Sequence, residues 1–386
     1  MKNVLDDMVG ESTLVEWTQR FVRFASPQTE RFEAEPAVQA FIADVGALLD
    51  ELKVPCRRDG MGSLIAELGP GGGRSAVLMA YAMTHPASNM SDPYAGEIVA
   101  IDGQAAIRGR GVSEQKASLA AALAASLAAH RSGRLKGRLV FAVSSAGETG
   151  RHDAARSILG NLQTHPTAAV IVIGTTGQVS LANKGRIDVL VVVHGRAAHS
   201  STPWRGLDAL KGAREVMRRL ESLDLGGREH PGLGTATLTP TSIRSFPNAT
   251  HTIQSEVHLT YDRRLLPGDE PEEALAQIAA AVEDVEPWRV EVKLGPIMFP
   301  SEIAPDAALV DSIRRGHRNA GLAAPSIFYS HGSLDAGLFW KEGIEATMWG
   351  PGAMDQWHSD NEYVLISDLM NGARAYDAFI RDYLME

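Results

Sequence analysis

The chain has 386 residues, of which 44% are hydrophobic, so it can bury one large core or two smaller ones. Its formal net charge of −10 leaves no basic surface for neutralising phosphates, which excludes nucleic acid as an expected partner and favours a small molecule. The single cysteine, Cys56, excludes an internal disulfide framework.

The first residues, MKNVLDDMVGES, lack the basic-then-apolar order of a secretory signal, and we therefore expect a cytoplasmic protein. A membrane-spanning helix needs about 20 apolar residues in succession. The apolar runs of this chain, such as 189–193, are much shorter. The sequence predicts no membrane segment.

Short β-branched runs alternate with alanine- and leucine-rich stretches in the first half of the chain. In chain order these are SAVLMAY (75–81), ASLAAALAASLAAH (117–130), GRLVFAVS (137–144) and AAVIVIG (168–174). Strands that alternate with helices indicate a mostly parallel sheet. Leu119, Leu123 and Leu127, spaced by four residues among alanines, predict a buried helix.

The pattern changes from about Ile187. The segments that follow are IDVLVVVHG (187–195), DALKGAREVMRRLESL (208–223), GTATLTPTSI (234–243), EVHLTYDRR (256–264) and PEEALAQIAAAVEDV (271–285). This order of strand, helix, two strands and helix predicts a small α+β domain, 187–295, inserted into a larger α/β domain formed by 1–186 and 296–386. The larger domain closes with the strand-like IEATMWG (344–350) and a helix from about Ile366.

Four segments in a fixed order carry a resemblance over nearly the whole chain. They are GRGVSEQKASLAAALAA (109–125), HGRAAHSSTPWRGLDAL (194–210), NATHTIQSEVHLTYDRRLLPGD (248–269) and WGPGAMDQWHSDNEYV (349–364). Together they resemble the two-metal aminoacylase and carboxypeptidase family, which includes acetylornithine deacetylase, succinyl-diaminopimelate desuccinylase and glutamate carboxypeptidase. The resemblance implies a catalytic α/β domain, an inserted lid that usually dimerises, two bridged divalent ions and cleavage of amide bonds.

The family's first metal-ligand segment is altered in this chain. AYAMTHP (80–86) places Tyr81 at the ligand histidine and Met83 at the aspartate that orients it. A thioether cannot accept the N–H of a metal-bound histidine or fix its tautomer. His85, four positions beyond Tyr81, is a candidate replacement acid or base.

The other ligand positions are partly retained. Glu114 stands for the bridging aspartate, Glu148 and His358 keep ligand positions, Gly147 replaces the general base, and Thr175 replaces a carboxylate. Because a two-ion site needs a compact set of histidine and carboxylate ligands plus a base, we expect no dinuclear centre and no cofactor. A single divalent ion at Glu114, Glu148 and His358 remains open.

The residues that the resemblance assigns to substrate binding are retained. His199 matches the lid histidine that reaches across the dimer to stabilise an oxyanion, and Asn248 and Arg264 match residues that hold substrate oxygens and a carboxylate. An arginine fork suits a carboxylate because it binds in a bidentate manner. We therefore expect a small carboxylate-bearing substrate and a homodimer formed through the lid.

The sequence predicts a hydrolase of amide-like C–N bonds with a rearranged, metal-independent site. Without cations, Glu114 and Glu148 would lie close together as acid and base, with His358 and His199 stabilising an oxyanion and Tyr81 donating a hydrogen bond. Lyase-type elimination and a single-metal hydrolase stay open. A catalytically silent binding homologue is the main alternative, and an ordinary metallopeptidase would require a second His-x-Asp at a strand end.

Overall fold

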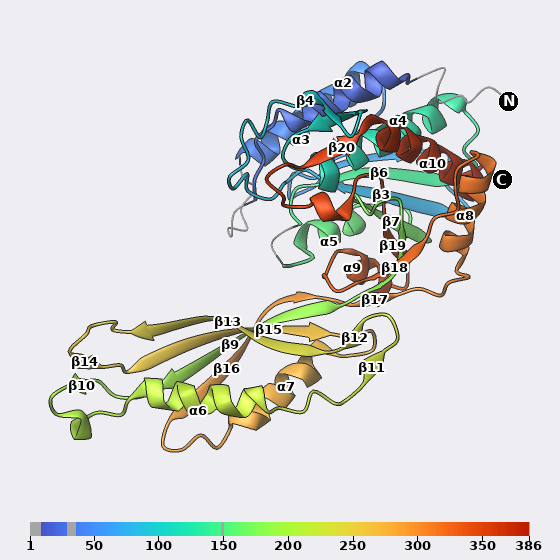
Figure 1. Ribbon diagram of the computed structural model, residues 1–386. Helices are drawn as coiled ribbons and strands as arrows, with labels where there is room; N and C mark the ends of the chain where they lie inside the picture. Colours follow the sequence, from blue (N-terminus) through green and yellow to red (C-terminus); the bar gives the residue numbers. More distant parts are fainter. Residues whose placement is uncertain (1–8, 29–35, 148–149, 386) are drawn as a thin grey trace. The chain divides into compact units, whose positions relative to one another are not determined.

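The computed structural model describes residues 9–28, 36–147 and 150–385, and its backbone forms two compact units. Unit 1 contains 1–181, 302–329 and 338–386, and unit 2 contains 182–301 and 330–337. The insertion predicted at 187–295 lies within the bounds of unit 2. Each unit has its own sheet and its own covering helices, as Figure 1 shows.

Unit 1 is built on a six-stranded sheet in the order β1-β2-β6-β3-β7-β19. The four strands from β6 to β19 run parallel, whereas β1 and β2 pair antiparallel, which confirms the predicted α/β fold with a mostly parallel sheet. All seven residues of β3 are buried, as expected of a central parallel strand. The strands are β1 (Arg57–Arg58), β2 (Leu64–Leu68), β3 (Ser75–Tyr81), β6 (Arg138–Ser144), β7 (Ala168–Val172) and β19 (Glu345–Trp349).

Helices cover this sheet. The alanine-rich segment forms α4 (Ala117–Ser132), of which thirteen residues are buried, and it packs against α10 (Ile366–Leu384) on one face of the sheet (Figure 1). The small alanine side chains let the two helix backbones approach closely. The other helices are α2 (Glu11–Val22), α3 (Pro36–Glu51), α5 (Asp153–Gly160), α8 (Ala308–Asn319) and α9 (Ala336–Lys341).

Two further three-stranded sheets complete the description of this part of the chain. One has the order β20-β5-β4 and the other β17-β8-β18. Their strands are β4 (Glu97–Ile101), β5 (Gln104–Arg108), β20 (Tyr363–Leu365), β8 (Val179–Asn183), β17 (Ser301–Glu302) and β18 (Ile327–Ser330). The β5–β20 pairing joins the segment that precedes residue 110 to the segment that precedes α10.

Unit 2 is a four-stranded antiparallel sheet in the order β13-β15-β9-β16, with α6 and α7 on one face. Alternate residues of β9, from Ile187 to Val193, are fully buried against these helices. The elements are β9 (Gly185–His194), β10 (Ala198–His199), α6 (Ala209–Glu221), β11 (Glu229–His230), β12 (Gly234–Thr235), β13 (Thr237–Phe246), β14 (Thr252–Ile253), β15 (Glu256–Leu265), α7 (Pro271–Val282) and β16 (Arg289–Met298).

Among the described residues, every helix is too short or too polar to cross a membrane.

Candidate active site

The residues that the sequence assigns to chemistry follow the carboxyl ends of the parallel strands in unit 1. Tyr81 ends β3, Gly147 follows β6, Thr175 follows β7, and His358 lies in the loop after β19. Adjacent parallel strands place such loops at one edge of the sheet, where α/β proteins bind ligands. Glu148 lies outside the described residues.

Glu114 lies in a single π-helical turn, η1 (Val112–Lys116), that leads into α4. The turn begins after Gly111, whose φ of 74° is in the left-handed region that glycine adopts without strain. Glu114 is 3% exposed. π-helical turns are frequent at functional sites because they displace a side chain from the regular helical pattern.

A second carboxylate, Glu362, holds this turn in place. The backbone N–H groups of Gly111, Ser113 and Glu114 donate to its two oxygens at 2.7, 2.9 and 3.1 Å. Arg110 donates from Nη1 at 3.0 Å, and both members of this ion pair are fully buried. Burial raises the pKa of Glu362, while its hydrogen bonds act in the opposite direction. Glu362 thereby satisfies donors that a helix start leaves unpaired.

Glu114 and His358 form an ion-pair contact at the sheet edge. Oε1 of Glu114 lies 3.3 Å from Nε2 of His358, whose side chain is 43% exposed. His358 has a φ of 59°, an uncommon backbone conformation for a histidine. Oε2 of Glu114 is buried and has no hydrogen-bond partner among the described residues. The pair therefore joins a buried carboxylate to a solvent-accessible imidazole.

His85 stacks on His358. The two ring centroids lie 3.9 Å apart and the planes differ by 15°. Burial, followed by the charge of His358, lowers the pKa of His85. A neutral His85 can lie against His358 without opposing a positive charge there. The structure thus places the candidate replacement His85 directly at the Glu114–His358 pair.

Tyr81 and Gly147 are packed as one unit. Tyr81 is 4% exposed, and a Cβ added at Gly147 would lie 2.6 Å from both Cδ1 and Cε1 of its ring and 3.1 Å from Sδ of Met83. Real Cβ atoms essentially never approach that closely. The phenol ring of Tyr81 therefore fills the space that a side chain at residue 147 would need, so the identities of these two residues depend on each other.

The hydroxyl of Thr175 is engaged by the backbone. It donates to the carbonyl of Gln178 at 2.6 Å and accepts from the N–H of Gly350 at 3.1 Å. The preceding Gly174 lies so close to its neighbours that an added Cβ would be 2.1 Å from the carbonyl oxygen of Ser113. Thr175 therefore serves as a turn residue that ties the end of β7 to the end of β19.

The candidate residues of unit 2 are described within that unit. Nδ1 of His199 lies 2.8 Å from Oγ of Ser201, and its ring is 5.8 Å from that of His251. His199 is exposed on β10, and Asn248 is exposed with a φ of 57°. The β10–β14 pairing, in which His199 faces Thr252, fixes the backbone at this end of the unit.

Arg264 is already paired. Its Nε and Nη2 donate to the two oxygens of Asp262 at 2.8 and 3.0 Å, and its Nη1 donates to the carbonyl of His331 at 3.4 Å. Residues two apart on a strand share a face, so β15 presents both side chains together. The fork that the sequence assigns to a substrate carboxylate is occupied by a carboxylate of this chain.

Comparisons with known proteins agree with this architecture. Residues 84–382 match the family model described as Peptidase family M20/M25/M40. The chain belongs to peptidase family M20/M25/M40. This confirms the resemblance drawn from the four segments and the prediction of an enzyme of a hydrolase family.

The individual proteins to which this chain is similar are distant from it in sequence. A probable carboxypeptidase from Uncinocarpus reesii is 26% identical over 76% of this chain and 67% of its own length. The uncharacterized protein YgeY of Escherichia coli is 25% identical, over 84% and 85%. The solved structure of an M20 family metallo-carboxypeptidase from Sulfolobus solfataricus has a TM-score of 0.77 at 15% identity and covers 96% of this chain and 99% of its own, which shows the fold.

M20 family members usually use divalent metals, and the described residues at this edge of the sheet do not form the ligand set of a two-ion centre. Within the described part of the chain, no group of three or more His, Cys, Asp or Glu side chains is arranged to hold an ion. The ring of Tyr81 occupies the space beside Gly147. The hydroxyl of Thr175 donates to the carbonyl of Gln178 and accepts from the N–H of Gly350.

Sequence reasoning missed the role of Glu362. The residue stands in the Asn-Glu-Tyr run of the closing segment, so its motif was visible. Its partners are backbone N–H groups some 250 positions earlier, and backbone donors leave no signature in a sequence. The available signal was that Glu362 lies close to the apolar Val364 in a segment expected to be buried. A buried carboxylate requires hydrogen-bond partners, so the sequence could have indicated a structural role for Glu362.

Proposed function

We propose that this chain hydrolyses an amide-like C–N bond in a small carboxylate-bearing substrate, with Glu114 and His358 as its acid–base centre and without a two-ion cluster. The observation that carries the proposal is the 3.3 Å approach of Glu114 Oε1 to His358 Nε2. Family membership and relatives named as probable carboxypeptidases support the class of bond.

The chemistry follows from the hydrogen-bonding capacity of the two groups. Because an ionised carboxylate only accepts, we propose that Nε2 of His358 carries the proton in this contact and that Nδ1 is the nitrogen that takes the proton from water. His358 is exposed enough to meet water and accepts a proton as the water attacks the carbonyl. Glu114 then stabilises the imidazolium, and His358 returns the proton to the leaving amine.

His85 limits where positive charge can develop. Because its pKa is lowered, it stays neutral beside His358 near pH 7, and its ring shields one face of the imidazole from water. Tyr81 is proposed as packing against Gly147 rather than as a ligand. Glu148 remains a candidate proton carrier on the strength of its family position alone.

The residues of unit 2 are proposed to bind the substrate, as the resemblance assigns them. His199 would stabilise the oxyanion, and Asn248 and Arg264 would hold substrate oxygens. The bidentate pair of Arg264 with Asp262 requires that an incoming carboxylate exchange with that of Asp262 or bind through Nη1. This makes carboxylate binding by Arg264 a competition between two anions.

The test is an assay of released amine on a panel of N-acyl amino acids and dipeptides, using chelator-treated protein. We expect a substrate whose turnover is unchanged by the chelator and falls about 100-fold or more in His358→Ala and Glu114→Gln. His165→Ala, an exposed histidine outside the site, is the matched control. Loss of activity with the chelator and its return with added zinc would refute metal independence. Full turnover in His358→Ala would refute the acid–base assignment.

A catalytically silent binding protein is the second candidate function. The observations that favour it are the phenol ring over Gly147 and the occupied fork of Arg264, which remove a base and engage a binding group. Saturable binding of N-acyl amino acids, with no released amine from any member of the panel, would support this candidate over the hydrolase.

We also propose a homodimer formed through unit 2. Strand β13 is at the edge of its sheet, where one row of backbone groups lacks a strand partner, and it exposes Ile243 at 55% and Phe246 at 41%. Long apolar edge strands are usually covered. Light scattering should give twice the chain mass for the wild type and the single-chain mass for Ile243→Lys. A monomeric wild type at micromolar concentration would contradict the proposal.

A further inference from the structure

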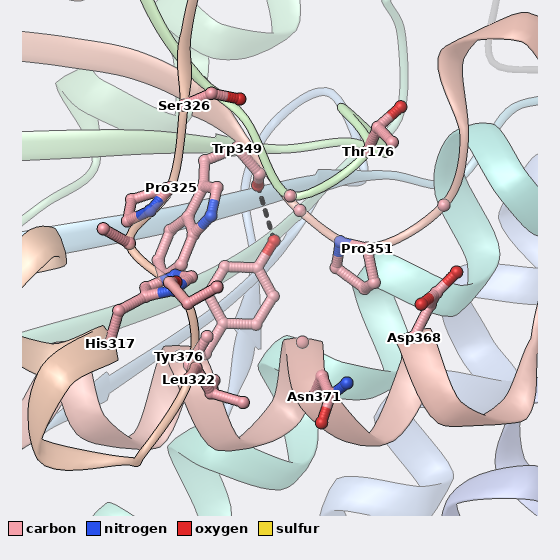
Figure 2. A pocket seen from close by; sticks show the side chains of 17 residues that line it. Thr176, His317, Leu322, Pro325, Ser326, Trp349, Pro351, Asp368, Asn371 and Tyr376 are labelled. Atoms are coloured by element: carbon pink, nitrogen blue, oxygen red, sulfur yellow. Dashed lines mark hydrogen bonds between the residues drawn. The ribbon is translucent and has the colours of Figure 1, made fainter.

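Unit 1 contains a pocket that does not include Glu114, His85 or His358. It has a volume of about 310 Å³ and lies between the end of β19, the first turns of α10, the end of α8 and the loop 322–326. Figure 2 shows Trp349 and Tyr376 joined by a hydrogen bond, with Asp368 and Asn371 on α10 to one side of them. The volume is at the lower end of the range of small-molecule sites.

The walls of the pocket are largely apolar, and the hydroxyl of the buried Tyr376 is already bonded to the backbone. The hydroxyl of Tyr376 donates to the carbonyl of Trp349 at 2.6 Å, and the two rings meet edge to face at 4.7 Å. Leu322, Pro325 and Pro351 continue the apolar surface. Such walls favour a ligand with an apolar, preferably planar, body.

His317 contributes no charge to the pocket. It is 7% exposed, and its Nδ1 lies 2.8 Å from the carbonyl oxygen of Ala323, which can only accept, so Nδ1 carries the proton. Burial lowers the pKa of His317, and the imidazole is therefore neutral near pH 7. Its Nε2 is buried and has no hydrogen-bond partner among the described residues.

Asp368 is the one acidic side chain among the lining residues, and Lys and Arg are absent from that set. The residue as a whole is exposed at the rim, whereas partial burial of its carboxyl group raises the pKa of Asp368. Because the lining residues of the pocket offer this carboxylate no Lys or Arg side chain, a positively charged ligand group is its favoured partner. The amide of Asn371, one turn further along α10, adds hydrogen-bonding capacity at the same end.

We propose that this pocket binds a small organic cation, an amine on an apolar or aromatic body, with the amine at Asp368 and the body against the wall of Leu322, Pro325 and Pro351. Thr176 and Ser326 at the rim distinguish this pocket from a purely apolar one, because their hydroxyls can meet a polar substituent of the ligand.

The pocket shares a wall with the candidate active site. The segment from Trp349 to Gly352 lines it, and the opposite side of this segment contacts the start of α4, where Ser118 donates to the carbonyl of Pro351 at 2.8 Å. A Cβ at Gly352 would lie 2.1 Å from the carbonyl oxygen of Ser113, the neighbour of Glu114. An occupant is therefore expected to change turnover, a consequence that rests on the proposed function, whereas binding itself does not.

Calorimetric titration with phenethylamine tests the site, with 3-phenylpropionate as the matched probe of opposite charge. We expect saturable binding of phenethylamine at millimolar concentration or below, and none of 3-phenylpropionate. Asp368→Asn should weaken phenethylamine binding at least about tenfold, because it removes the charge and keeps the shape. Asp306→Asn, an exposed aspartate outside the pocket, should bind as the wild type does.

A second variant locates the site without relying on charge. Ala324→Trp places a large ring on an exposed lining position and should abolish phenethylamine binding while leaving the melting temperature of the free protein unchanged within a few degrees. Absence of saturable phenethylamine binding would overturn the proposal. So would equal affinity for the two probes, or unchanged phenethylamine affinity in Asp368→Asn or Ala324→Trp. None of these outcomes depends on finding a substrate for the hydrolase.

Discussion

The sheet edge of unit 1 and the open sheet face of unit 2 hold their charges in opposite ways. In unit 1, Glu362 and Arg110 are fully buried and three backbone N–H groups complete the carboxylate's shell. In unit 2, Arg264 and Asp262 keep about a quarter and a fifth of their side-chain surface exposed. The first arrangement fixes the backbone around Glu114, whereas the second holds two long side chains that water and other ions can separate.

The largest expected effect comes from breaking the buried pair. Glu362→Ala leaves Arg110 and three backbone donors buried without an acceptor, and we expect it to lower the free energy of unfolding by about 3–5 kcal/mol. Urea denaturation gives the value, and Asp306→Asn provides the baseline for a surface carboxylate in the same unit. A loss below about 1 kcal/mol would mean that the buried network is not a structural unit.

A smaller loss of stability is expected at Gly147, where the ring of Tyr81 leaves no room for a side chain. Gly147→Ala should destabilise the protein by about 1–3 kcal/mol, because its Cβ meets the ring of Tyr81. In a Tyr81→Ala background the same substitution should cost much less, since the ring is absent. Thermal unfolding of the four proteins in this double-mutant cycle measures the coupling. Additive effects of the two changes would contradict the packing of Tyr81 over Gly147.

The buried Lys116 and an exposed lysine should differ in how their contributions to stability depend on pH. Burial lowers its pKa well below 10.5, so the folded protein disfavours the charge that the unfolded chain carries. A lowered pKa means that the stability from this residue is fully present above 10.5 and is lost as pH falls toward the folded value. The stability of the wild type relative to Lys116→Met should therefore rise from pH 8 to pH 10.5. The exposed Lys211→Met should show no such difference in urea melts.

The smallest effect is expected at the surface pair of unit 2. Asp262→Asn removes the charge opposite Arg264, and the free energy of unfolding should change by less than about 1 kcal/mol. The same change should strengthen the binding of a carboxylate substrate, because the fork of Arg264 no longer has a competing anion. Isothermal titration with the substrate found in the amine-release assay measures it. Weaker binding in Asp262→Asn would show that Asp262 positions Arg264 instead of competing for it.

Much of the fold could be predicted from local pattern. The β-branched runs at 75–81 and 168–174 became β3 and β7, and the alanine-rich run became the buried α4. Strand β16 was missed although Arg, Val, Glu, Val and Lys alternate as in a half-buried strand, because Gly295 and Pro296 interrupt the pattern after only a few residues. β16 lies at the edge of its sheet and pairs with one strand, β9, so its sequence can be less apolar than that of a central strand.

The sequence could predict which residues belong to the candidate site, but it could not predict the contacts between them. Motif order placed Glu114 and His358 in one site, but their 3.3 Å contact and the stacking of His85 depend on backbone turns that residue types do not specify. The ring of Tyr81 leaves no room for a side chain at residue 147, and this contact depends on how close the two backbone segments lie in the fold. The pairing of Arg264 with Asp262, by contrast, follows from strand alternation and could have been drawn from the sequence.

The hydrogen bonds from the η1 turn to Glu362 join two segments that are synthesised far apart in time. The turn is made when less than a third of the chain has left the ribosome, and the carboxylate that pairs with its N–H groups follows 248 to 251 positions later. A nascent chain can form α4 but has no acceptor for these donors until the segment ahead of α10 arrives. The backbone around Glu114 therefore gains this support only after residue 362 has been made, and a chain that stops before that residue lacks it.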